Sequence, residues 1–235
     1  MSIVERRERE KKQRQHDIIN AAEKLFFSRG YDDVSMKDIA SEVDLSKATL
    51  YLYFQNKESL FFAIVLRGTR ILNSMIREAI ENEDKGIEKV AAYRRAYNQF
   101  TQKYPDYIQI YNYFQSGRFN IPHKEIKKEN KKSRNKNSKK LDISIPYVNQ
   151  CAMEIIKLRN ERFSLLCNSI QKGVEDKTIR EDINPVEGAV LLSSISKSLS
   201  DIPSDREKIL KNHGIDYKKY FSDVDDLINH MLTTK

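Results

Sequence analysis

Residues 35–54 read SMKDIASEVDLSKATLYLYF and decide the fold of the amino-terminal part of the chain. Ser35, with Asp38 three residues later, is the capping-box pattern that begins a helix, and apolar residues follow at helical spacing. Asp44-Leu45 then predicts a tight corner, and Ser46 is the N-cap candidate of a second short helix from Lys47 to Phe54. Two short helices joined by such a turn are typical of a helix-turn-helix that reads DNA.

This motif requires an apolar inner face that locks the two helices and an outer face that enters the major groove. The predicted inner face is Met36, Ile39, Ala40, Val43, Leu45, Leu50 and Phe54. The second helix keeps a short polar and aromatic surface outward: Lys47, Ala48, Thr49, Tyr51 and Tyr53. Taken singly, Tyr51 and Tyr53 fit packing better than phosphate contact, and only their place in the motif favours DNA.

Longer helices surround the motif. Apolar periodicity and caps predict helices over Glu5–Arg29, Lys57–Glu81, Gly86–Lys103, Pro105–Ser116, Tyr147–Gly173, Pro185–Ser200, Ser204–Leu210 and Tyr217–Thr233. The chain has only 7 Gly and 5 Pro in 235 residues and no period-2 alternation, so we expect an all-α fold.

Several stretches together resemble the DNA-binding domain of the tetracycline-repressor (TetR) family: IINAAEKLF at 18–26, Gly30-Tyr31, SMKDIA at 35–40, LSKATLYLYF at 45–54 and NKESL at 56–60. The resemblance covers about a quarter of the chain and is nearly gapless. It implies an all-helical homodimeric regulator. Residues 1–57 would form the DNA-binding domain, with the helix-turn-helix at about 35–54, and residues 58–235 a helical domain that binds a small effector and dimerises.

Carried over residue by residue, the resemblance implies these DNA contacts: Lys37, Ser46, Lys47, Ala48, Thr49, Tyr51, Tyr53 and Lys57. Lys57 matches the lysine at the amino end of the fourth helix, where an ammonium and a helix N-terminus together hold a phosphate. The chain departs from the family at its corner, where Asp44 replaces the common Gly. Because Asp tolerates left-handed backbone better than most residues, we expect the turn to be kept.

Aromatic residues recur at helical spacing in the middle of the chain: Tyr93, Tyr97, Phe100, Tyr104, Tyr107, Tyr111 and Phe114. They are either ordinary core or the lining of an effector pocket. Tyrosine hydroxyls among apolar side chains suit a small-molecule site, with Arg94, Arg95 and Arg118 as possible partners of an anionic ligand. We expect the helix from Tyr147 to Gly173 to complete this pocket.

The last helices are the candidate dimer interface. Small residues among larger apolar ones would let two helices approach closely, as in a four-helix bundle around a two-fold axis. The predicted interface residues are Gly188, Ala189, Leu192, Ile195, Val224, Leu227, Ile228 and Met231.

The net charge of +8, from 42 basic and 34 acidic residues, does not lie in the motif. Residues 35–57 balance three Lys against Asp38, Glu42 and Asp44, whereas residues 123–140 carry nine Lys and Arg against two Glu. We expect 123–140 to be a flexible loop. A protein that binds nucleic acid or membrane surfaces non-specifically through this segment is the alternative function.

Other classes find less support. Cys151 and Cys167 fit neither a disulfide framework nor a metal site, and His16, His123, His213 and His230 are scattered without a catalytic motif. The segment Met1–Gln15 has no apolar core, and we find no stretch of about 18 uninterrupted apolar residues. The expectation is a cytoplasmic protein that is not an enzyme, has no cofactor or metal and does not bind membranes. Its partners are an operator duplex, a small effector and a second copy of the chain, and repression is the expected outcome.

Overall fold

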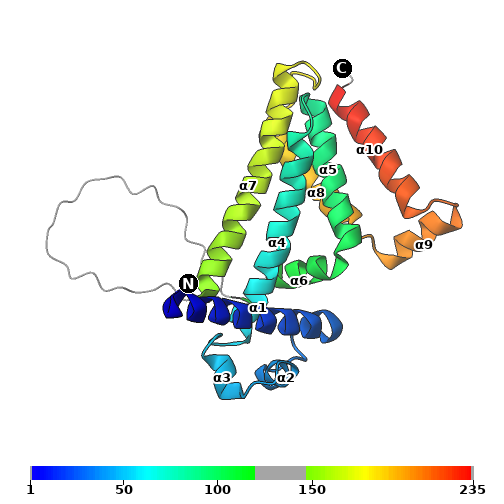
Figure 1. Ribbon diagram of the computed structural model, residues 1–235. Coiled ribbons are helices and arrows are strands. Elements are labelled where there is room, and N and C mark those ends of the chain that lie inside the picture. Colours follow the sequence, from blue (N-terminus) through cyan, green and yellow to red (C-terminus); the bar gives the residue numbers. More distant parts are fainter. Residues whose placement is uncertain (1, 120–146, 234–235) are drawn as a thin grey trace. The chain divides into compact units, whose positions relative to one another are not determined.

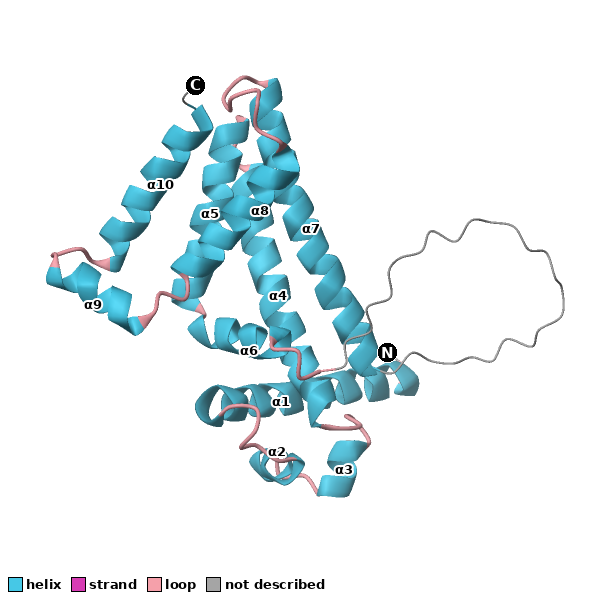
Figure 2. Cartoon of the chain, turned by 180° about the vertical axis from the view of Figure 1, so that it is seen from behind, coloured by secondary structure: helices cyan, strands magenta, loops and turns pink. Residues whose placement is uncertain are grey.

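The computed structural model describes residues 2–119 and 147–233. The described chain is helical (Figures 1 and 2): α1 (Ile3–Arg29), α2 (Met36–Glu42), α3 (Lys47–Tyr51), α4 (Lys57–Glu81), α5 (Gly86–Lys103), α6 (Pro105–Gln115), α7 (Tyr147–Glu175), α8 (Pro185–Leu199), α9 (Ser204–Asn212) and α10 (Tyr217–Thr233). No strand occurs in these ranges, and the all-α prediction is confirmed. The Lys-rich segment 123–140 lies outside the described residues.

The chain divides into two compact units. Unit 1 comprises Met1–Arg67 and Gln109–Ile156, and unit 2 comprises Gly68–Ile108 and Lys157–Lys235. Helix α4 therefore contributes residues up to Arg67 to the first unit and the rest to the second. The predicted boundary after residue 57 divides a DNA-binding domain from an effector-binding and dimerisation domain. The two compact units are defined by packing, so they do not test this boundary, and it stays a prediction.

Helix ends follow the caps that the side chains provide. Helix α1 begins earlier than predicted because Ser2 and Glu5 form a capping box, and Asn56 accepts the Ser59 amide at 2.8 Å to begin α4. Helix α3 ends at Tyr51 rather than Phe54, because the amides of Leu52 and Tyr53 bond to carbonyls three residues back. The prediction for the end of α3 was wrong by three residues.

Helix α4 is the principal core helix of the described chain. Its sequence is long and apolar enough to cross a membrane, but 72% of its most apolar 18-residue window is buried against the protein. Phe61, Phe62 and Ile64 are buried in unit 1, and Leu72 and Ile76 in unit 2. The apolar character of α4 is therefore accounted for by the core.

Close backbone contact joins α5 and α7 within unit 2. A Cβ atom on Gly86 would lie 1.9 Å from the Gly173 nitrogen. The Gly86 amide also donates to Asp176 at 2.8 Å, and this bond is among those that lower the pKa of Asp176, of which the largest comes from Thr178. Gly86 therefore permits the approach of α5 to the backbone of α7 at Gly173, and α7 does not end there but runs on to Glu175.

The first prediction concerns this approach. Gly86→Ala forces α5 and α7 apart, so we expect the free energy of unfolding to fall by about 1–3 kcal/mol. Gly188→Ala is the matched control, because its Cβ would meet flexible side-chain atoms of Ile170 and Ile183 at 3.2 and 3.3 Å. Denaturant unfolding of both variants measures the difference, and equal stability of the two would contradict the proposed backbone contact.

Candidate nucleic-acid interface

Helices α1, α2 and α3 form a three-helix cluster around a small core in unit 1. Helix α2 contacts both α1 and α3. The residues that lock the pair are Ile39, Ala40, Leu50 and Phe54, all buried, as the sequence predicts. Asp44 occupies the corner with φ of 52°, so the left-handed turn is kept without glycine. The arrangement is that of a helix-turn-helix.

Capping fixes the start of each short helix. The Ser35 hydroxyl accepts the Asp38 amide at 3.2 Å, and the Ser35 amide donates to the Asp38 carboxylate at 2.8 Å. Hydrogen bonds from Ser35 lower the pKa of Asp38, so the box is intact at neutral pH. At α3, the Ser46 hydroxyl accepts the Thr49 amide at 3.0 Å and pairs with the Thr49 hydroxyl at 2.8 Å. Both hydroxyls serve the cap in this structure.

The predicted DNA contacts divide by exposure. The exposed ones are Lys37, Ser46, Lys47, Ala48 and Tyr51, while Thr49, Tyr53 and Lys57 are partly buried. Tyr53 follows the end of α3 and is not on the helix. The exposed residues of α3 that can face a DNA groove are therefore Lys47, Ala48 and Tyr51.

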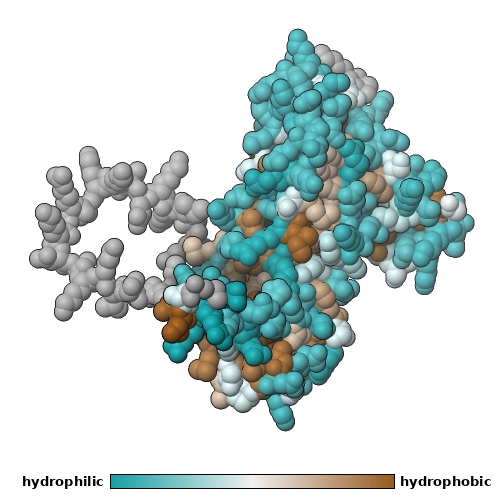
Figure 3. Space-filling model, viewed as in Figure 1, coloured by the Kyte–Doolittle hydropathy of each residue, from teal (hydrophilic) through white to brown (hydrophobic). Residues whose placement is uncertain are grey.

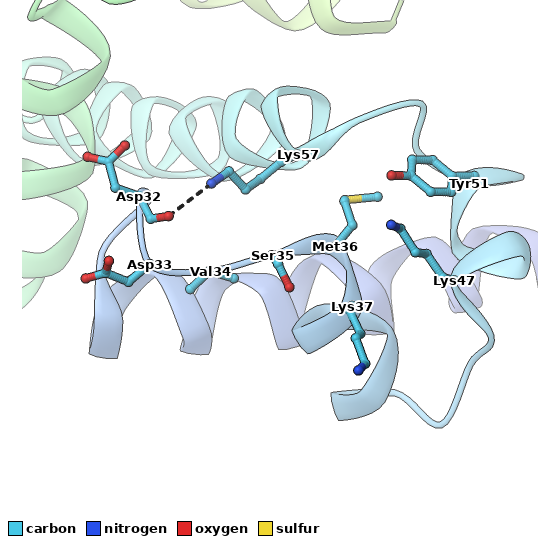
Figure 4. A pocket seen from close by; sticks show the side chains of 9 residues that line it. All are labelled: Asp32, Asp33, Val34, Ser35, Met36, Lys37, Lys47, Tyr51 and Lys57. Atoms are coloured by element: carbon cyan, nitrogen blue, oxygen red, sulfur yellow. Dashed lines mark hydrogen bonds between the residues drawn. The ribbon is translucent and has the colours of Figure 1, made fainter.

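A shallow pocket of about 410 Å³ lies beside this surface. Figure 4 shows Lys47 and Tyr51 at one end of it, and the ammonium of Lys47 lies 5.9 Å from the Tyr51 ring centroid. Lys37 extends from α2, and Asp32 and Asp33 stand at the opposite end. Lys47 lies near α3, whereas the ammonium of Lys57 reaches the aspartate end, where it bonds to the Asp32 carbonyl. The α3 end therefore offers an ammonium without a neighbouring carboxylate, which favours a phosphate there.

Lys57 is held inward. Its ammonium donates to the Tyr31 carbonyl at 2.8 Å and lies 4.2 Å from the Tyr31 ring centroid. A weaker contact of 3.5 Å to the Asp32 carbonyl is drawn in Figure 4. Lys57 therefore anchors the loop before α2, and any phosphate contact would share an ammonium that already bonds to this loop.

An aromatic cluster that the sequence analysis did not identify stabilises the same loop. Residues 109–119 return to unit 1, where Tyr113 and Phe119 lie 5.3 and 5.4 Å from the Tyr31 ring centroid. Tyr113 donates to Asp32 at 2.8 Å, and Arg118 pairs with the same carboxylate at 3.1 Å. Burial is the main reason that the pKa of Tyr31 is raised to about 12. No pattern in the local sequence predicts these contacts, because they join residues more than 80 positions apart.

The aromatic residues of the predicted effector pocket are mostly packed. Tyr93, Phe100 and Tyr107 are buried in unit 2, with Tyr97 and Tyr104 partly buried there, whereas Tyr111 and Phe114 belong to unit 1. Two cavities of unit 2 have other linings. One, of about 360 Å³, lies among α5, α8, α9 and the start of α10, and the other, of about 400 Å³, lies between α4 and α5.

The three predicted arginines have carboxylate partners. Arg95 meets Glu83 at 3.3 Å, Arg118 meets Asp32, and Arg94 pairs with Asp225. Arg94 is only 1% exposed, and its Nε and Nη2 atoms have no hydrogen-bond partner among residues 2–119 and 147–233. Burial lowers the pKa of Arg94, while Asp225 opposes the shift.

The predicted dimer residues differ in exposure. Ala189, Leu192 and Ile228 are buried within the chain itself, and Gly188, Ile195 and Val224 are partly buried. Leu227 is 68% exposed and Met231 38% exposed on α10. On α8 the exposed apolar residues are Val186, Val190 and Leu191, which the prediction did not include.

Comparison with known proteins agrees with this geometry. Residues 18–64 match the family model described as bacterial regulatory proteins, tetR family. The helix-turn-helix transcriptional regulator YuxN of Bacillus subtilis is 33% identical over 103 residues, which are 42% of this chain and 32% of that protein. The chain therefore spans about a third of the length of this curated relative.

Solved structures extend the likeness in fold to nearly the whole chain. A tetR-family regulatory protein from Rhodococcus RHA1 has a TM-score of 0.64 at 17% identity and covers 93% of this chain and 96% of its own. AibR, solved with isovaleryl coenzyme A and operator DNA, has a TM-score of 0.59 at 18% identity, covering 94% and 98%.

The motif, its capped helices and its outward α3 surface define a DNA-binding helix-turn-helix protein. Residues 18–64 match the tetR family model over the same helices, so this part of the chain has the DNA-binding region of tetR-family bacterial regulatory proteins.

The second prediction distinguishes the role of Lys47 in DNA binding from the structural role of Lys57. Lys47→Ala removes an exposed ammonium, so we expect DNA affinity to fall about tenfold, with the salt slope reduced by about one and the melting temperature unchanged. Lys57→Met removes the bond to the Tyr31 carbonyl, and we expect a loss of about 1–2 kcal/mol in the free energy of unfolding as well. Titration of labelled duplex and thermal unfolding measure both. Loss of stability in Lys47→Ala would contradict its assignment to the interface.

Proposed function

We propose that this protein is a cytoplasmic, dimeric transcriptional repressor that binds a palindromic operator through α3 and is released by a small, largely apolar effector. The observation that carries the proposal is the exposed Lys47, Ala48 and Tyr51 surface of α3, mounted on a buried helix-turn-helix core. Two copies related by a two-fold axis would present two such surfaces, which suits a palindrome with half-sites about one helical turn or a little more apart.

The third prediction tests operator recognition. Selection from random duplexes with the full chain should enrich a two-fold symmetric sequence, and its footprint should survive excess competitor DNA. A binder that acts only through charge would enrich no sequence and would be removed by competitor. Placing the selected sequence over a promoter and measuring transcription with and without the protein distinguishes repression from activation, and activation would contradict the proposed direction.

The effector site is proposed in unit 2, around the buried Tyr93, Phe100 and Tyr107. Tyr rings with hydroxyl groups can hold an apolar body and orient its polar end. Arg94 supports an anionic group on the effector, because a buried guanidinium with two unsatisfied nitrogens, Nε and Nη2, is costly and would gain from a carboxylate or phosphate. The operator assay, repeated with short-chain carboxylates and their coenzyme A thioesters, measures release.

The dimer is proposed to form through exposed apolar residues of α8 and α10, with Val190 and Leu191 on the first and Leu227 and Met231 on the second. Leu227 and Met231 are four residues apart and so share one face of α10. Apolar side chains of this size left in water favour association, because covering each contributes about 1.5–3 kcal/mol.

The fourth prediction concerns this face. Leu227→Asp should shift the protein from dimer to monomer at micromolar concentration and abolish cooperative operator binding, while the fold is retained because the side chain is already exposed. Ile209→Asp is the control, since Ile209 is 57% exposed on α9, outside the proposed face. Sedimentation measures both variants, and a dimeric Leu227→Asp protein would contradict the assignment.

A further inference from the structure

The first half of α1 extends beyond the helix-turn-helix core. All residues from Ser2 to Arg14 are exposed, and the first buried residue of the helix is Ile18. The stretch Ile3–Asp17 is about 22 Å long at 1.5 Å per residue. Both ribbon views show this half of α1 reaching past α3 (Figures 1 and 2). Because its side chains are exposed in the part of the chain that the structure describes, this half of α1 contributes little to the core.

The extension is helical for local reasons. Glu, Arg, Lys and Gln, which favour helix, fill it. The Ser2–Glu5 capping box closes its first turn, and the pairs Arg6–Glu10 and Gln13–Asp17 link successive turns at 2.9 Å each. Because isolated helices of this length are marginal, continuity with the packed half of α1 supplies the rest of the stability.

One row of basic residues lies on the helix-turn-helix side of α1. Arg7, Lys11 and Arg14 stand at spacings of four and three, and the row continues into the buried Ile18 and Ala22. The opposite side is marked by Asn20 and Glu23, which bond to Arg67 of α4 at 2.9 and 3.0 Å. In Figure 1, α2 and α3 lie on one side of α1 and the start of α4 lies on the other.

These three cations are free to bind a partner. Within the described ranges, Arg7, Lys11 and Arg14 take part in no ion pair, whereas Arg6 is held by Glu10. A membrane surface is the less suitable partner, because the apolar side chains of the extension are confined to Ile3 and Val4 in its first turn, and residues 5–17 contain none to enter lipid. Figure 3 shows hydrophobic side chains near this end of the chain only as small patches among hydrophilic ones.

We propose that the exposed first half of α1 is a second DNA-contacting element, in which Arg7, Lys11 and Arg14 bind backbone phosphates flanking the bases read by α3. The inference rests on the proposed DNA-binding function and extends its footprint. Phosphate contacts of this kind carry no sequence information, but they add affinity and salt dependence. A reach of about 22 Å corresponds to about six base pairs.

The test compares two triple variants of the full chain with the same change of charge. R7Q/K11Q/R14Q removes the row on the helix-turn-helix side, and R6Q/R9Q/K12Q removes three cations from other faces of the same segment. Glutamine keeps the helix propensity. Affinity is measured against salt concentration on operators with long flanks and on operators trimmed by about six base pairs at each end.

We expect R7Q/K11Q/R14Q to lower the salt slope by about two to three and to bind long and trimmed operators equally, with the same selected sequence. The control variant should keep most of the wild-type slope and the preference for long flanks. Equal losses in the two variants, or no loss in either, would overturn the proposal. If wild-type protein selects no sequence, the proposed operator function fails, yet the comparison of salt slopes on arbitrary duplex still tests the extension.

Discussion

The contact between Lys57 and Tyr31 is the constraint on which the helix-turn-helix depends. Lys57 begins α4, the core helix, and Tyr31 lies in the loop that leads into α2, so the 2.8 Å bond between them fixes the motif on the scaffold. Phe61 adds a ring 4.8 Å from that of Tyr31, and Phe26 of α1 lies 6.0 Å from Phe61. Edge and tilted contacts of this kind each add about 0.5–1.5 kcal/mol beyond the area they bury. These contacts therefore hold the loop before α2 on α1 and α4, and α2 in turn contacts α3.

The same cluster makes residues 113–119, the end of α6 and the residues that follow it, part of unit 1. Phe119 stacks on Phe61 at 5.1 Å, and Asp32 receives both Tyr113 and Arg118. Because these polar contacts are exposed, each contributes little to stability, and the rings supply most of the attachment. Any change that moves residues 113–119 would therefore act directly on the loop before α2.

The sequence specified the features whose causes are local. Ser35 with Asp38, Ser46 and Asn56 begin helices where predicted, and Asp44 takes the left-handed corner, because each side chain satisfies its own neighbouring backbone. The inward turn of Lys57 and the return of Tyr113 to Asp32 depend on tertiary contacts, so no pattern within a window of residues reveals them. The same limit applies to Ala189 and Leu192, whose small and apolar character fits an interface and a core equally well, and which the structure buries within the chain.

The helix-turn-helix carries no net charge, so the electrostatic attraction of the protein for DNA phosphates depends on residues outside it. The segment 35–57 has three lysines against three acids, and its corner places Asp44 close to the reading surface, so its attraction for phosphates is weak at long range. Residues 3–17 carry six cations against four acids, and three of those cations share the side of α1 that bears α2 and α3. A preformed helix binds phosphates without the ordering entropy that a flexible arm would lose. Under the two proposals, α3 would read the sequence and the cations of α1 would add electrostatic affinity for the flanking phosphates.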